Sequence, residues 1–125
     1  MKKTGVIVFS HGSKLKTAND MEVRLVEELR RRLGTPLIEP AFMEHSESTI
    51  PAAIERLVSA GCSHIFGYAF FLVSGRHSSQ DIPAIFERAL KNHPGVTCEI
   101  TAPMLNDPAL TDLVEKRIRS GLGIH

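Results

Sequence analysis

Two histidines, His11 and His77, each come directly after an apolar run and stand beside glycine and serine. His11 follows residues 6–9 within Ser-His-Gly-Ser, and His77 follows residues 65–73 within Ser-Gly-Arg-His-Ser. A neutral imidazole is a good ligand for borderline divalent metals and can also accept a proton as a general base. A lone histidine near a strand end is more often structural, but the repeated pattern makes this pair a candidate for metal binding or catalysis.

The residues around the two histidines suit a ligand that carries several negative charges. Local positive charge comes from lysine and arginine, and small polar residues offer backbone N–H groups and hydroxyls to an anion. Glu44 follows another apolar segment and adds a carboxylate that could accept protons. We therefore predict a catalytic role for Glu44 beside the histidines, and ligand contacts from Ser10, Gly12, Ser13, Lys14, Ser74, Gly75 and Arg76.

Four apolar segments have the length and composition of short strands: residues 5–9, 36–43, 65–73 and 96–101. Between and after them, apolar residues recur with the 3.6-residue period of amphipathic helices. The pattern predicts a first helix from Asp20 to the glycine at position 34, and helices capped by Ser48 or Thr49, by Ser78 or Ser79, and by Asp107. In the last helix, Leu110, Leu113, Val114 and Ile118 are expected to face the core.

Strands that alternate with helices indicate right-handed crossovers and a mainly parallel sheet. The predicted fold class is therefore α/β, with about four strands and helices on both faces. The length favours a single domain over residues 1–125. Because parallel strands end at the same edge of a sheet, His11, Glu44 and His77 should open on one rim, where open α/β sheets bind ligands.

The composition is that of an average globular domain, with 42% hydrophobic and 23% charged residues. A formal net charge of +1 argues against a general nucleic-acid binder, which usually carries a basic stripe. Cys62 and Cys98 form no CxxC motif and so signal neither a zinc ribbon nor an iron–sulfur cluster. Because no apolar run approaches the roughly 18 residues of a membrane span and no signal peptide is evident, we expect a cytoplasmic protein.

The motifs at these strand ends resemble those of the short class II chelatases of the CbiX type. The similar stretches are Val-Phe-Ser-His-Gly-Ser at 8–13, Phe-Met-Glu at 42–44, and Phe-Leu-Val-Ser-Gly-Arg-His-Ser-Ser-Gln-Asp-Ile-Pro at 71–83. The resemblance covers nearly the whole chain, and Gly-x-His-x₃-Asp-Ile-Pro at 75–83 is its most specific part. The chain departs from the family pattern at three places. Lys14 stands where arginine is common, and His45 stands where an apolar residue is usual. A proline usually precedes the Phe-Leu of the third strand, and this chain has Ala69 and Phe70 in that region.

The resemblance implies a chelatase-like, flavodoxin-like α/β domain that inserts a divalent metal into sirohydrochlorin during tetrapyrrole and cobalamin biosynthesis. Cobalt is the first choice of metal, with nickel or iron as alternatives, and no organic cofactor is implied. His11 and His77 match the family histidines that handle the metal, and Glu44 matches an acidic position after the second strand. Because the short forms have half the length of two-domain chelatases, a homodimer is expected.

Three other interpretations stay open. Histidine phosphatases also carry His-Gly after the first strand, but they need an arginine directly before that histidine, where this chain has Ser10. A non-catalytic metal or tetrapyrrole carrier could use the same rim, and turnover separates it from a chelatase. A plain α/β interaction domain would show no metal binding that depends on His11 and His77.

Overall fold

The computed structural model describes the chain except residues 1–2, 71–75, 102–106 and 125, and for residues 76–81 it describes the backbone alone. The described part alternates strictly between strands and helices, as the sequence predicts. In chain order the elements are β1 (Thr4–Ser10), α1 (Lys16–Leu33), β2 (Ile38–Phe42), α2 (Ile50–Ser59), β3 (His64–Ala69), α3 (Arg76–Leu90), β4 (Thr97–Ile100) and α4 (Pro108–Leu122).

The strands form one parallel sheet in the order β2-β1-β3-β4. β1 lies between β2 and β3, and its Val6 is in register with Ile38 on one side and Phe66 on the other. The predicted single α/β domain with a parallel four-stranded sheet is confirmed. Since all four strands run the same way, the loops that follow β1, β2 and β3 leave the sheet at one edge.

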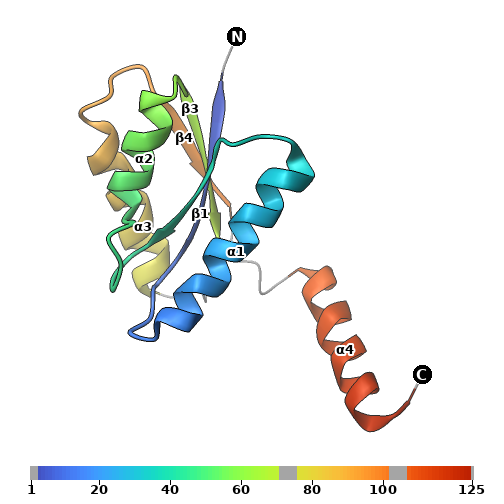
Figure 1. Cartoon of the computed structure of the whole chain (residues 1–125). Helices are drawn as coiled ribbons and strands as arrows, with labels where there is room; N and C mark the ends of the chain where they lie inside the picture. Colours follow the sequence, from blue (N-terminus) through green and yellow to red (C-terminus); the bar gives the residue numbers. More distant parts are fainter. Residues whose placement is uncertain (1–2, 71–75, 102–106, 125) are drawn as a thin grey trace.

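Helices cover the two faces of the sheet unequally (Figure 1). Successive residues of β1 point to opposite faces, so Ile7 and Phe9 face α2 and α3, whereas Val8 packs with Val26 of α1. The ring of Phe9 meets that of Phe86 edge to face, with centroids 5.5 Å apart. The larger core thus lies between the sheet and the α2–α3 pair, and the smaller one lies under α1.

Local signals predicted several helix ends correctly. Thr49 caps α2 by accepting a hydrogen bond from the Ala52 N–H at 3.2 Å, and Asp107 caps α4 by accepting from the Ala109 N–H at 2.8 Å. Gly34 ends α1 with φ of 65°, a left-handed conformation that glycine adopts at little cost.

Two predicted helix starts are wrong. α1 begins at Lys16 rather than Asp20, and its first turn closes where the Ala18 N–H donates to the Leu15 carbonyl oxygen at 3.1 Å. The residues of this first turn are mostly polar, so the apolar period on which the prediction depended starts one turn later. α3 begins at Arg76 rather than after Ser78 or Ser79, so Pro83 lies inside the helix instead of near its entrance. The backbone of His77 therefore belongs to the first turn of α3 and not to a loop.

The prediction that α4 packs against the core is also wrong. No residue of α4 is buried, and of the four residues expected to face inward only Leu110 is even half-buried. Figure 1 shows α4 extending away from the sheet, beyond the end at which the strands finish. The apolar residues of α4 do recur at helical spacing, but the described part of the chain does not bury their side chains.

None of the helices in the described residues combines the length and the apolar character that crossing a membrane requires.

Candidate functional site

The loops after β1 and β2 are joined to each other by backbone hydrogen bonds. The Met43 N–H donates to the Ser10 carbonyl oxygen at 2.9 Å, and the Glu44 N–H donates to the His11 carbonyl oxygen, also at 2.9 Å. The pairing of β1 with β2 therefore continues past the sheet. It brings His11 and Glu44, two of the predicted catalytic residues, next to each other.

Gly12 is the residue that permits this approach. Its φ of +89° lies in the left-handed region, and a Cβ placed there would stand 2.0 Å from the carbonyl oxygen of Glu44. That distance is far inside van der Waals contact, and the obstacle is backbone rather than a movable side chain. A glycine after His11 is thus required by how closely the two loops pass.

Asn19, in the first turn of α1, ties the same loops to the helix. Its side-chain oxygen accepts from the Ser13 N–H at 2.9 Å, and its amide nitrogen donates to the carbonyl oxygens of Ser13 at 3.0 Å and His45 at 3.3 Å. The backbone of His45 is itself in the left-handed region, with φ of 59°. Sequence reasoning missed Asn19, although an asparagine near a helix start is a common sign of side-chain bonding to a turn.

The candidate side chains on these loops are open to solvent. His11 is exposed, and the Glu44 side chain is 64% exposed. His45 Nε2 lies 3.7 Å from Glu44 Oε1, which is too far for a well-formed hydrogen bond. An imidazole and a carboxylate are thus presented on a firmly held backbone with side chains available to a ligand.

A buried carboxyl group lies beneath this rim, and sequence reasoning missed it. Glu22 of α1 is only 2% exposed, and neither carboxylate oxygen has a hydrogen-bond partner in the described part of the chain. Burial raises the pKa of Glu22 to about 7, and the nearby Ser10 hydroxyl and Ala41 backbone oppose part of that rise without reaching hydrogen-bond geometry. One sign of this burial is present in the sequence. Glu22 lies four residues before Val26 in α1, and side chains at that spacing share one face of a helix.

The structure accounts for the other predicted ligand residues unequally. Ser10 and Ser13 are half-buried and Lys14 is exposed. The backbone N–H of Ser13 already donates to Asn19, and its hydroxyl accepts from the Leu15 N–H at 3.1 Å, so it is less free to bind a ligand than predicted. Ser74 and Gly75 lie outside the described residues, as do the side chains of Arg76 and His77.

The end of β3 nevertheless lies beside the strand that leads to His11. β3 pairs directly with β1, with Ala69 in register with Phe9, and the Phe70 N–H donates to the Phe9 carbonyl oxygen at 2.8 Å. The chain thus leaves β3 next to the strand that ends before His11, and it enters α3 at Arg76. Among the side chains that the structure describes, no three His, Cys, Asp or Glu residues gather as a ready metal site.

Comparison with known proteins gives a consistent set of relatives. A family model described as CbiX matches residues 5–121. The sirohydrochlorin ferrochelatase of Arabidopsis thaliana chloroplasts is 36% identical over 115 residues, which are 92% of this chain and 51% of that protein. The sirohydrochlorin cobaltochelatase of Methanosarcina barkeri is 31% identical over 130 residues, with 97% of this chain and 98% of that protein covered. The chain therefore spans about half the length of the plant relative and nearly all of the archaeal one.

Solved structures show the same fold. A CbiX protein from Marinobacter aquaeolei superimposes with a TM-score of 0.84 at 25% identity, covering 97% of this chain and 98% of that chain. SirB from Bacillus subtilis with Fe³⁺ superimposes with a TM-score of 0.88 at 26% identity, and the alignment covers 100% of this chain, α4 included, but 49% of that chain. With the family model matched from β1 to the end of α4, this chain belongs to the CbiX family.

Proposed function

We propose that this chain is a sirohydrochlorin chelatase that inserts a divalent metal into the tetrapyrrole. The observation that carries the proposal is the joined pair of loops, which presents His11 and Glu44 together at the carboxyl edge of the sheet in a CbiX-family chain. Cobalt is the metal we favour, because the Methanosarcina barkeri relative, which the chain covers almost completely, is named a cobaltochelatase. Iron is an alternative because relatives named ferrochelatases also match, and nickel is a further divalent candidate for imidazole ligands.

Metal insertion needs a metal ligand and a proton acceptor on the same rim. The metal replaces the two pyrrolic protons of the macrocycle, so two N–H bonds break and two protons must leave as the metal becomes bound to the four ring nitrogens. In our proposal His11 and His77 hold the incoming metal, and Glu44 or one of the imidazoles accepts protons as a general base. The exposed Glu44 carboxylate suits that role because it can pass protons directly to water.

The acidic edge of sirohydrochlorin requires cations and hydrogen-bond donors around the histidines. Lys14 is exposed beside the His11 loop and can pair with a substrate carboxylate. The substrate-binding residues that we propose are Ser10, Gly12, Ser13, Lys14, Ser74, Gly75 and Arg76. No organic cofactor enters this scheme, and the metal is a substrate.

The proposed working form is a homodimer in which residues 1–125 of each chain act as one chelatase unit. A single rim carries one His11–His77 pair and covers only part of a macrocycle, and SirB is about twice as long as this chain. A twofold dimer would place two such rims around one ligand through an isologous interface. A cytoplasmic location remains a prediction.

Metallation can be followed directly by visible absorption. Purified protein, sirohydrochlorin and Co²⁺, Ni²⁺ or Fe²⁺ should give the spectrum of the metallated product faster than the same mixture without protein. Comparing the three metals under anaerobic conditions assigns the preferred one. Binding of metal or tetrapyrrole without any acceleration would instead identify a carrier, and absence of both would contradict a role in this chemistry.

A further inference from the structure

The loop between β2 and α2, which carries Glu44, is closed by hydrogen bonds at both ends. At its start the Glu44 N–H donates to the His11 carbonyl oxygen. At its end the Phe42 N–H donates to the carbonyl oxygen of Ser48 at 2.8 Å, and the Ser48 hydroxyl donates to the Pro40 carbonyl oxygen at 2.7 Å. Ser48 is therefore the second fixed point of the loop, and it ties the loop back to the strand from which it leaves.

Arg56, on α2, holds Ser48 in this position. Its Nη2 donates to the Ser48 hydroxyl oxygen at 2.9 Å, and its Nε lies 3.2 Å from a carboxylate oxygen of Glu39 in β2. The guanidinium therefore makes two contacts at once, one with the loop and one with the strand. The planar fork of an arginine suits this bridge, because its donors point in fixed and different directions, whereas a lysine presents all of its donors from one nitrogen.

A second arginine holds the carboxylate with which Arg56 pairs. Arg30, on α1, places its Nη2 3.0 Å from the other Glu39 oxygen, and its Nε donates to the Ile38 carbonyl oxygen at 2.8 Å. The Glu39 side chain is only 19% exposed, so these ion pairs are better shielded from water than pairs on the open surface. Because α1 and α2 cover opposite faces of the sheet, the Arg30–Glu39–Arg56 network contacts β2 from both faces.

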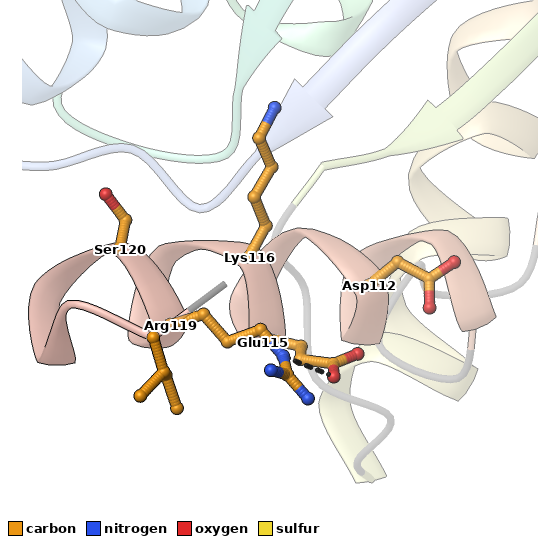
Figure 2. A pocket seen from close by; sticks show the side chains of 6 residues that line it. Asp112, Glu115, Lys116, Arg119 and Ser120 are labelled. Atoms are coloured by element: carbon orange, nitrogen blue, oxygen red, sulfur yellow. Dashed lines mark hydrogen bonds and ion pairs between the residues drawn. The ribbon is translucent and has the colours of Figure 1, made fainter.

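Other ion pairs of the described residues lie within single helices. Figure 2 shows one of these, Glu115 with Arg119, in a shallow hollow of α4. The Arg119 Nε lies 2.9 Å from the carboxylate, but both side chains are about half-exposed and belong to the same helix. Arg32 and Glu28 form a similar pair on α1, also at 2.9 Å. Such exposed pairs contribute little to stability. The network at Arg56 differs because it connects two helices, a strand and a loop.

The conformation of His45 shows why the end of the loop must be held. Its φ of 59° lies in the left-handed region, which is costly for a residue other than glycine and persists where the surrounding structure fixes it from both sides. Before it, Glu44 is bonded to the loop after β1, and after it Ser48 is bonded to β2 and Arg56. Release of Ser48 allows His45 to return to a more favourable conformation, and that rotation turns the peptide unit that it shares with Glu44.

We propose that Arg56 is a positioning residue for metallation: through Ser48 it holds the loop in the conformation that presents Glu44 at the rim. This inference rests on the proposed function, in which the Glu44 carboxylate is suited to accept protons. Arg56 acts through Ser48 and contacts neither the metal nor the substrate. Glu39 keeps the guanidinium directed at Ser48, and Arg30 keeps Glu39 in place.

The first test measures turnover in variants of Arg56. Arg56→Ala should fold, because alanine favours helices and Arg30 still pairs with Glu39. We expect about a 10-fold lower kcat for metallation and a KM for sirohydrochlorin within about twofold of the wild type, since a displaced catalytic group slows the chemical step. Arg56→Lys, which keeps the charge but not the fork, should recover only part of kcat. Arg32→Ala is the matched control, because the ion pair that it removes lies within one helix, and it should keep the wild-type kcat.

A double-mutant cycle with Glu44→Gln shows whether Arg56 acts through Glu44. If it does, Arg56→Ala should lower kcat in the wild type but cause no further loss in the Glu44→Gln background. A general loss of structure would instead lower kcat by the same factor in both backgrounds. That outcome, or a wild-type kcat in Arg56→Ala, would overturn the proposal.

Hydrogen exchange tests the anchoring of the loop separately from metallation. The Phe42 amide, which donates to Ser48, should exchange about 10-fold or more faster in Arg56→Ala and in Ser48→Ala than in the wild type. The Val6 amide, which donates to the Leu37 carbonyl oxygen between the same two strands, should not change. Unchanged exchange at Phe42 would mean that Arg56 does not hold the loop, and the proposal would be wrong even for an active chelatase. A wild type that does not metallate would refute the proposed function and the catalytic purpose of Arg56, while exchange at Phe42 would still decide the anchoring.

Discussion

The Glu44 N–H donates a hydrogen bond to the His11 carbonyl oxygen across 2.9 Å, so the ends of β1 and β2 stay joined beyond the sheet. This bond joins an imidazole-bearing residue of the loop after β1 to a carboxylate-bearing residue of the loop after β2. Positioning of reacting groups by a fixed backbone is a large part of enzymatic rate enhancement. The residues around this bond therefore give the sharpest predictions about the site.

Gly12→Ala should disrupt the rim, because its Cβ would stand 2.0 Å from the Glu44 carbonyl oxygen in a left-handed backbone conformation. Gly34→Ala is the matched control, since Gly34 is also left-handed but has no atom within 4 Å of the added Cβ. We expect Gly34→Ala to lower the free energy of unfolding by only about 1–2 kcal/mol, the cost of the left-handed conformation for alanine. Gly12→Ala should lower the free energy of unfolding clearly more, as measured by urea unfolding, and should also lower the rate of metallation. Equal effects in the two variants would show that the close contact is unimportant.

His11→Ala and His77→Ala should each lower the rate of metallation by about 100-fold or more, the usual scale for a positioned acid–base group or ligand. His93→Ala is the control, because His93 pairs with Glu55 at 2.6 Å and belongs to neither strand-end motif. Rates would be measured from visible spectra under saturating metal. Near-wild-type activity in either rim variant would remove that histidine from the proposed site.

Glu44→Gln should leave stability unchanged but slow turnover by about 10- to 100-fold if its carboxylate accepts protons. Stability is insensitive because the side chain is 64% exposed and the bond to His11 uses the backbone. Glu47→Gln is a suitable control on the same loop, where Glu47 is also exposed. An unaltered rate for Glu44→Gln would shift the proton acceptor to a histidine.

Asn19→Ala should destabilise the loops after β1 and β2, since it removes hydrogen bonds to Ser13 and His45. The expected loss is about 1–3 kcal/mol, with a raised KM where the loops bind substrate. Asn92→Ala, at an exposed position after α3, should change little. Thermal unfolding and hydrogen exchange at the loop amides would detect the difference, and full protection of those amides in Asn19→Ala would contradict the bridging role.

Glu22 should make stability depend on pH. Its pKa is raised from 4.5 to about 7 by burial, so the folded chain holds a proton that the unfolded chain releases between these values. Stability should therefore fall as pH rises from about 5 to 8, by up to about 3 kcal/mol from this group.

Glutamine cannot ionise, so Glu22→Gln avoids the loss of stability that ionisation of the buried carboxyl group causes. The variant should therefore be more stable than the wild type at pH 8, and the difference should be small at pH 5. Glu27→Gln, at an exposed position on the same helix, should show no such difference between the two pH values. Urea unfolding at both pH values measures the effect. A Glu22→Gln variant whose difference from the wild type is the same at both pH values would mean that folding does not raise the pKa of Glu22.

The sequence by itself determined the order of the elements and the edge of the sheet at which His11 and Glu44 lie. Apolar runs and 3.6-residue periods are local properties, and they specified a parallel α/β sheet with His11 and Glu44 after its strands. Caps at Thr49 and Asp107 are local in the same sense, because each satisfies an N–H within three residues. The start of α3 was missed because polar residues such as Ser78 and Ser79 favour a cap but do not exclude a helix.

The tertiary structure alone decided the contacts between residues far apart in sequence. That Gly12 lies against the Glu44 carbonyl oxygen depends on the pairing of β1 with β2, and no pattern within either segment reports it. The burial of Glu22 depends on how α1 rotates over the sheet, which a helical period defines only to within a residue or so. The exposure of α4 shows the same limit: periodicity reveals that Ile118 lies on an apolar stripe, but only packing decides which surface, if any, covers it.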